Sequence, residues 1–282
     1  MPDRTSSHSE RLLALVTSAL AGPPGVRRIA TAVVAGVICH VVFGMAVLAM
    51  IGAMFFGMSA SLGRVPWPWA MVANAVLVLQ FPLVHSALLG PARRLLQRIG
   101  PYGATLATTS YAIIASLQLA SLFALWTPSG IVWWRAEGTA FGVLCVAYAT
   151  AWLLLVWASW DAGAEVQSGA LGWLSLAANR APRFPDMPEH GLFAIVRQPI
   201  YLAFALTLWT VPVWTPDQLA VAVVLTSYCV LAPRLKERRF AALYGHRFAT
   251  YRRRVPYMLP DLSRRARHDV DRHTAGRSGR TH

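Results

Sequence analysis

The sequence predicts an all-α polytopic membrane protein: about six transmembrane helices, the last two a short hairpin, and then an amphipathic cytoplasmic helix near the carboxyl terminus. Two observations favour this class. Hydrophobic residues make up 56% of the 282 residues and charged residues only 13%, a balance that soluble domains of this length seldom have. Several apolar stretches also approach or exceed the ~20 residues that a helix needs to cross a hydrocarbon core.

Four of these stretches are long enough to cross a membrane as separate helices. They cover residues 29–58, 67–89, 105–126 and 138–160. Turn-forming prolines separate neighbouring stretches, with Pro66 before the second and Pro128 before the fourth. We therefore expect a four-helix transmembrane region over residues 29–160, preceded by an amino-terminal cytoplasmic or interfacial segment, residues 1–28.

Two shorter apolar runs follow a polar, proline-punctuated stretch. They cover residues 199–214 and 218–231, and the turn residues between them favour a tight helical hairpin. We assign residues 161–260 to one carboxyl-terminal region that contains this hairpin and a following amphipathic helix. Residues 261–282 are rich in arginine and lack an apolar period, which predicts a disordered basic tail attracted to anionic lipid.

Basic residues flank the spans unevenly. The loops on one side of the predicted membrane hold Arg27, Arg28, Arg93, Arg94 and Arg98, and those on the other hold little beyond Arg64 and Arg135. Because basic loops stay in the cytoplasm, this asymmetry predicts a bacterial inner-membrane protein with both termini cytoplasmic. The formal net charge of +14 then reflects membrane orientation, and no nucleic-acid partner is expected.

Ionisable residues are almost absent from the middle of the spans, which disfavours a proton relay or an ion pathway. The lack of an internal repeat likewise disfavours an inverted-repeat transporter. His40 and His85 are the exceptions, but they lie at different depths, so we expect no haem held by both. Cys39, Cys145 and Cys229 lie far apart in apolar spans, and no metal site is predicted.

One polar cluster lies at residues 189–201, where Arg197 and Gln198 come directly before Pro199. Proline at this position can open a helix. The free N–H groups of the helix start, with the charge of Arg197, would attract an anion such as a carboxylate. The alternative is an ordinary interfacial helix start with an arginine that reaches towards water.

A second cluster covers residues 235–251. Apolar side chains recur there at helical spacing on one side: Phe240, Leu243, Tyr244, Phe248 and Tyr251. This pattern predicts a helix that lies along the membrane surface with that side inward. Glu237 is the lone acid among basic neighbours that include Lys236. The alternative is a surface ion pair in a lipid-binding basic helix.

Together the two clusters resemble the isoprenylcysteine carboxyl methyltransferase superfamily. Its members carry Gly-x-Tyr-x-x-x-Arg-His-Pro-x-Tyr, a hairpin, and Glu-Glu-x-x-Leu-x-x-x-Phe-Gly-x-x-Tyr-x-x-Tyr. The corresponding positions are Gly191, Phe193, Arg197, Gln198, Pro199 and Tyr201, then Lys236, Glu237, Phe240, Tyr244, Gly245, Phe248 and Tyr251. Weaker matches at residues 84–94 and 109–128 resemble a bacterial branch that contains methanethiol S-methyltransferases and NnrU-like proteins.

This resemblance implies an enzyme that uses S-adenosyl-L-methionine, bound in a cytoplasmic pocket, to methylate a small or lipophilic acceptor arriving through the bilayer, most simply a thiol. The cofactor-binding residues it implies are His190, Gly191, Arg197, Gln198, Pro199, Tyr201, Glu237, Tyr244, Arg247 and Tyr251. Arg197 and Glu237 are also the implied catalytic residues, and His85 is our candidate to take the thiol proton.

Two alternatives stay open. Gln198 and Lys236 stand where the family has histidine and glutamate, so the chain can be a catalytically altered or inactive NnrU-like membrane protein. A membrane reductase of the steroid-reductase type has a related architecture, and binding of a nicotinamide cofactor would favour it.

Overall fold

The computed structural model describes residues 8–90 and 92–260, so the predicted basic tail lies outside the described residues. The helices are α1 (His8–Leu20), α2 (Val26–Phe55), α3 (Trp69–Leu89), α4 (Arg93–Gln97), α5 (Gly103–Leu125), α6 (Gly138–Asp161), α7 (Ala164–Gln167), α8 (Ala170–Ala177), α9 (Pro199–Trp209), α10 (Pro216–Tyr244) and α11 (His246–Arg254). A 3-10 turn covers Gly191–Ala194, and two short strands, β1 (Trp134–Arg135) and β2 (Val213–Trp214), pair antiparallel.

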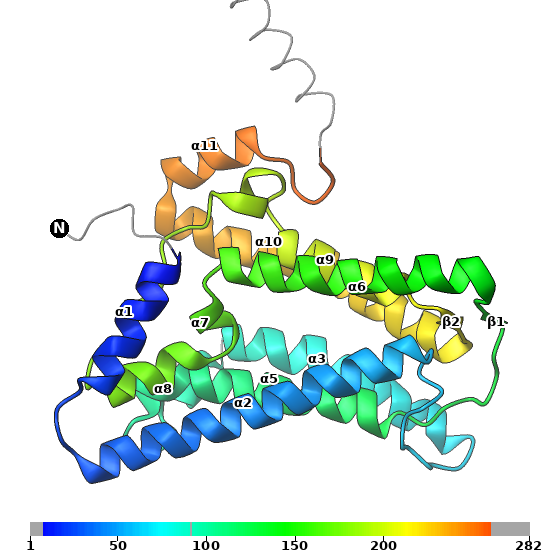
Figure 1. The fold of residues 1–282 in the computed structure, drawn as a ribbon, viewed down its shortest axis with the longest axis horizontal. Helices are drawn as coiled ribbons and strands as arrows, with labels where there is room; N and C mark the ends of the chain where they lie inside the picture. The colour runs from blue at the N-terminus through cyan, green and yellow to red at the C-terminus, as the bar shows by residue number, and fades with distance from the viewer. Residues whose placement is uncertain (1–7, 91, 261–282) are drawn as a thin grey trace, which may run out of the picture.

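The predicted polytopic helical bundle is confirmed. Within the described residues, five helices are long and apolar enough to cross a membrane: α2, α3, α5, α6 and α10. The long helices run side by side in Figure 1, with α1 and α11 at one end of the bundle and β1 and β2 at the other. We call these the basic end and the strand end. Large apolar side chains such as Leu153 on α6 are exposed, as expected of lipid-facing surfaces.

The predicted break after residue 231 is wrong. The second arm of the hairpin does not end before a separate surface helix, because α10 runs without interruption for 29 residues and contains Pro233. Proline removes one backbone hydrogen bond, and helices in membranes tolerate this where neighbouring groups compensate. Lys236 and Glu237 therefore lie on the last turns of a long, fixed helix.

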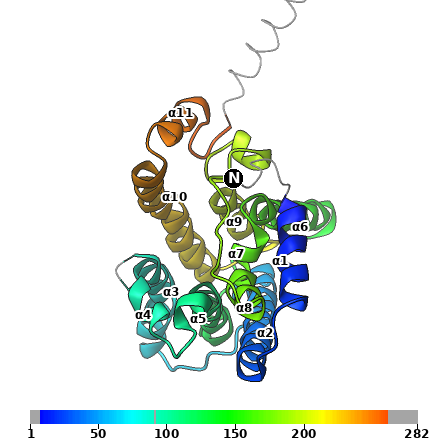
Figure 2. The same ribbon diagram turned by 90° about the vertical axis from the view of Figure 1, so that its left-hand side faces the viewer.

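The structure also contains two short helices, α7 and α8, in a stretch predicted only to be polar and irregular. Figure 2 shows α8 beside α2 and α5 at the basic end. Leu171 and Leu174 of α8 are buried, and Thr109 of α5 accepts a hydrogen bond from the Trp173 backbone N–H at 3.0 Å. At eight residues, α8 is too short to give the pattern of a membrane span.

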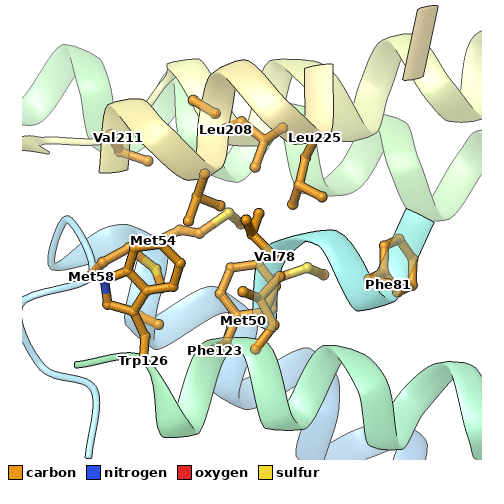
Figure 3. Close-up of a cluster of buried hydrophobic side chains, with 14 of the residues drawn as sticks. Met50, Met54, Met58, Val78, Phe81, Phe123, Trp126, Leu208, Val211 and Leu225 are labelled. Atoms are coloured by element: carbon orange, nitrogen blue, oxygen red, sulfur yellow. The ribbon is translucent and has the colours of Figure 1, made fainter. Parts of the chain in front are cut away.

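Seen from the basic end, the helices form two groups, α2, α3, α5 and α8 on one side and α6, α9, α10 and α11 on the other (Figure 2). A buried apolar cluster joins them, in which Met54 and Phe123 of the first group meet Leu208 and Leu225 of the second (Figure 3). Asp217 adds a polar link, since it accepts a hydrogen bond from the Trp126 indole at 3.0 Å. The two groups are therefore fixed to one another away from the basic end.

Helix α1 crosses the basic end of the bundle beside α8 (Figure 1). Arg11 of α1 forms a 3.0 Å ion pair with the buried Glu165, and Arg180 donates a hydrogen bond to Ser18 at 3.0 Å. The predicted interfacial segment is therefore a helix that is anchored to the protein as well as amphipathic.

Because Leu208 is fully buried in the cluster that joins the two groups, we expect Leu208→Ala to lower the free energy of unfolding by about 2 kcal/mol through the cavity it leaves. Leu153→Ala is the matched control, since Leu153 is 69% exposed, and should change it by less than about 0.5 kcal/mol. Equilibrium unfolding in mixed detergent measures both. Equal losses would contradict this description of the core.

Candidate functional site

The start of α9 is shaped by the turn that precedes it. Gly191 has a φ of +59°, and a side chain there would overlap the carboxylate of Asp161. That carboxylate accepts a hydrogen bond from the Leu192 backbone N–H at 2.8 Å, which ties the turn to the end of α6. Pro199 then opens α9 with Gln198 as the capping residue, so Arg197 and Gln198 are held at a fixed helix start.

Arg197 links α9, α10 and the carboxyl-terminal segment. Its guanidinium lies 2.9 Å from Glu237 Oε1 and donates to the backbone carbonyl of Val255 at 2.6 Å. Its own backbone N–H donates to the Pro256 carbonyl at 2.9 Å, and the Tyr257 ring lies 5.4 Å away. One side chain therefore gathers three segments that are far apart in the sequence.

Gln198 is the third member of a polar group that it forms with Arg197 and Glu237. It is only 3% exposed, and its Nε2 donates to Glu237 Oε1 at 2.9 Å. Its Oε1 is buried and has no hydrogen-bond partner among the described residues. Because an unsatisfied buried acceptor costs about 1–3 kcal/mol, this oxygen marks a place where a ligand N–H or O–H would be stabilised.

A small cavity adjoins these groups. It encloses only about 10 Å³, and its lining combines the three polar residues with a second cation and apolar or aromatic side chains: Pro188, Phe193, Arg197, Gln198, Lys236, Glu237, Phe240, Phe248 and Tyr251. The Lys236 ammonium lies 5.5 Å from the centre of the Phe193 ring and 5.3 Å from that of Phe240. The aromatic walls therefore suit a planar ligand, and Lys236 already supplies a cation beside two of the rings.

Tyr251 fixes one wall of the cavity. Its hydroxyl donates to the Phe193 carbonyl at 2.7 Å. Burial raises the pKa of Tyr251 well above its usual range, so the hydroxyl stays protonated and remains a donor at neutral pH.

Residues 186–190, which we call the cover segment, lie against the cavity, and Pro188 forms part of its lining. Arg247 holds it by ion pairs with Asp186 at 2.6 Å and Glu189 at 2.7 Å. The hydrogen bond to Asp186 is the main cause that raises the pKa of Arg247. Since Arg247 is half exposed, these pairs are worth at most about 1 kcal/mol each. The ion pairs therefore fasten the cover segment only weakly, and the buried Met187 side chain, which packs with Phe248 and Tyr251, also holds it.

The structure brings together only part of the residue set implied by the resemblance. Arg197, Gln198, Glu237 and Tyr251 line the cavity. Tyr244 and Arg247 lie at its edge, with the Arg247 guanidinium 5.9 Å from the centre of the Tyr244 ring. The structure places the other implied residues elsewhere: His190 and Gly191 in the preceding turn, Pro199 at the start of α9, and Tyr201 and His85 outside the cavity lining.

Sequence reasoning missed several lining residues. Phe240 and Phe248 were predicted to face the membrane from a surface helix, but they line the cavity instead. Phe248 and Tyr251 are buried with Met187, whereas Leu243 of the same predicted face is 72% exposed. The spacing of the aromatic residues did indicate a buried helix face. A helical period, however, shows only that one face of a helix is buried and not which residues cover that face.

No protein-family model matches the chain, and no solved structure matches it. A methanethiol S-methyltransferase of Pseudomonas sp. (strain GM41(2012)) is 27% identical over 79% of this chain and 87% of its own length. The chain is similar in sequence to proteins named methanethiol S-methyltransferase. Methanethiol S-methyltransferase 2 of Bradyrhizobium diazoefficiens is 29% identical over 71% of this chain and 77% of its own length.

A protein named Nurim from Xenopus laevis is also similar, at 27% identity over 68% of this chain and 74% of its own length. The similarity therefore extends well beyond the two motifs and includes the transmembrane region. The predicted relationship to the membrane methyltransferase branch is confirmed.

Because Arg197 holds the carboxyl-terminal segment through backbone carbonyls, we expect Arg197→Ala to release residues 246–257. Amide hydrogen exchange in this segment should become at least about tenfold faster, which corresponds to a loss of about 1.4 kcal/mol of local protection. Arg238→Ala removes an exposed arginine of α10, next to Glu237, and should leave the exchange unchanged. Equal exchange in both variants would contradict the anchoring role of Arg197.

Proposed function

We propose that the chain is an S-adenosylmethionine-dependent integral-membrane methyltransferase that methylates a small thiol at the cytoplasmic face of a bacterial inner membrane. The observation that carries the proposal is the buried Arg197, Gln198 and Glu237 group, with its unsatisfied Gln198 oxygen, beside an aromatic cavity at the basic end. The similarity to proteins named methanethiol S-methyltransferase supports both the reaction class and the acceptor.

The polar groups of S-adenosylmethionine match this set of side chains. Its carboxylate suits Arg197, since an arginine binds carboxylates through paired hydrogen bonds. Its ammonium and ribose hydroxyls are donors, which suit Glu237 and the free oxygen of Gln198. Its adenine ring suits the aromatic walls. The chemistry of the residues present therefore fits the cofactor.

The cavity must widen to admit it. Pockets for molecules of this size enclose roughly 300–1,000 Å³, far more than the cavity provides. The opening that we propose moves the cover segment, which would break its ion pairs to Arg247 and withdraw Met187 from its apolar cluster. Opening it would expose Glu237 and Gln198 to the cytoplasm without disturbing α9 or α10.

When bound, S-adenosylmethionine supplies an electrophilic methyl group on its sulfonium. The protein then has to hold the donor still, bring the acceptor into line with the methyl carbon and keep water away. Arg197, Gln198 and Glu237 would hold the donor's polar end. Phe193, Tyr251 and the closed cover segment would exclude water.

The position of the site fits its two substrates. A charged donor comes from water, whereas a small thiol partitions into the bilayer, so the reaction belongs where the helices leave the membrane. The positive-inside rule assigns the basic end to the cytoplasm, where S-adenosylmethionine would reach the site directly.

Calorimetry of the purified protein tests the proposal. We expect S-adenosylmethionine and S-adenosylhomocysteine both to bind with dissociation constants below about 1 mM, and Glu237→Gln to weaken binding at least about tenfold, or 1.4 kcal/mol. Glu137→Gln, at the strand end, is the matched control and should bind normally. No binding of either ligand to the wild type would overturn the proposal, and binding of NADPH instead would favour the reductase alternative.

Gln198→His introduces the residue type that the resembling family has at this position, and so tests whether the glutamine has the same role. If the amide acts as the family's histidine does, affinity for S-adenosylhomocysteine should hold or rise, because an imidazole can also bond to Glu237. A loss of tenfold or more would mean that this pocket depends on the amide oxygen. Transfer to a thiol, measured with the same variant, separates an active enzyme from a relative that binds the cofactor without turnover.

A further inference from the structure

A second polar cluster lies deeper in the bundle, beside the candidate cofactor site. His85 of α3 lies 2.5 Å from the Tyr111 hydroxyl of α5, measured from Nε2. The His85 ring also packs against Phe81, with centroids 4.9 Å apart, and edge-on against Tyr228 of α10, at 6.1 Å. Three transmembrane helices therefore converge on one imidazole.

This cluster is close to the candidate cofactor site. Tyr201 follows Gln198 by about one turn of α9, and Tyr228 and Arg239 of α10 lie near enough to influence its hydroxyl. Tyr201, Tyr228 and Arg239 likewise lie near the Tyr111 hydroxyl. Arg239 is held nearby by a 2.8 Å hydrogen bond from its guanidinium to the Leu89 carbonyl at the end of α3. The cluster and the cavity therefore share the first turn of α9 and the last turns of α10.

One nitrogen of His85 is unused. Nδ1 is buried and has no hydrogen-bond partner among the described residues, while Nε2 is engaged by Tyr111. A phenol hydroxyl can donate to an imidazole nitrogen or accept from its N–H. Tyr111 can therefore stay bonded to the ring whether Nδ1 is free or has taken a proton.

We propose that this cluster is the acceptor site, in which His85 Nδ1 takes the proton of a small thiol, Tyr111 positions the imidazole and Arg239 stabilises the thiolate. The inference rests on the proposed methyltransferase function and specifies its acceptor half. Arg239 is the cation proposed here because it belongs to this cluster, whereas Arg197 and Arg247 are paired with carboxylates at the cofactor site and the cover segment.

The chemistry balances in two steps. The thiol S–H bond breaks, its proton moves to Nδ1, and the electron pair stays on sulfur. That pair then forms the S–CH₃ bond as the bond from methyl to the sulfonium breaks, and the donor leaves as a neutral thioether. His85 finally releases the proton to water, so the net products are a methyl thioether, S-adenosylhomocysteine and one proton.

The surroundings favour an acceptor that is small and apolar. Phe81 and Tyr228 pack around the imidazole, so an acceptor beside His85 would meet mainly apolar and aromatic groups. On the same helix Leu83 and Val84 are 67% and 40% exposed, so the lipid-facing surface begins within two residues of His85. A thiol dissolved in the bilayer has only a short distance to travel.

The test compares two acceptors of similar size, ethanethiol and the more acidic trifluoroethanethiol. A thiol that is already ionised needs no base. We therefore expect His85→Gln to slow transfer to ethanethiol by about 10²–10⁴-fold and to trifluoroethanethiol by less than tenfold. Tyr111→Phe should also slow transfer to ethanethiol more than transfer to trifluoroethanethiol, but by a smaller factor than His85→Gln. His40→Gln, on the exposed side of α2, is the matched control and should change neither rate.

Binding of S-adenosylhomocysteine, measured on the same variants, keeps the two proposals apart. It should be unchanged in His85→Gln and Tyr111→Phe. If the wild type binds the ligand and transfers methyl groups but His85→Gln slows both thiols equally or neither, the acceptor site is wrong and the methyltransferase stands. If the wild type neither binds nor transfers, both proposals fall.

Discussion

The arrangement of the basic end depends on the buried ion pair between Arg197 and Glu237, whose side chains are only 11% and 13% exposed. A buried pair stabilises a structure only when further hydrogen bonds satisfy both partners, because removing two charges from water is costly. Gln198 and the carbonyl of Val255 provide those bonds. The pair therefore fixes the start of α9, the end of α10 and the carboxyl-terminal segment relative to one another.

The membrane explains why this pair lies where it does. Charges are costly inside the hydrocarbon region, so the polar groups gather where α9 and α10 reach the basic end, and the apolar cluster around Met54 and Leu208 holds the two helix groups together further in. His85 lies between these regions, with one nitrogen still unpartnered among the described residues. In the proposed function, a donor from water and an acceptor from lipid would approach this place from opposite directions.

The sequence predicted those features of the fold that depend on hydrophobic periodicity and on the length of apolar stretches. The fourth span was predicted as residues 138–160 and observed as Gly138–Asp161. Arg197, Gln198 and Glu237 were predicted from the sequence to belong to one site, and they are in contact in the structure. Pattern alone did not show that α10 continues past Pro233, because proline normally ends a helix. It did not reveal α8 either, nor the contact of Tyr111 with His85, which depends on how separate helices pack.

The central claim is that the cavity between Arg197, Glu237 and the aromatic walls binds S-adenosylmethionine. Ultraviolet crosslinking of S-adenosylmethionine with a tritiated methyl group, followed by peptide mapping, tests it most directly. The account predicts label in peptides that contain residues 186–202 or 234–251, and its loss when S-adenosylhomocysteine is in excess. Label confined to the strand end or to α2, or label that the competitor does not remove, would contradict it.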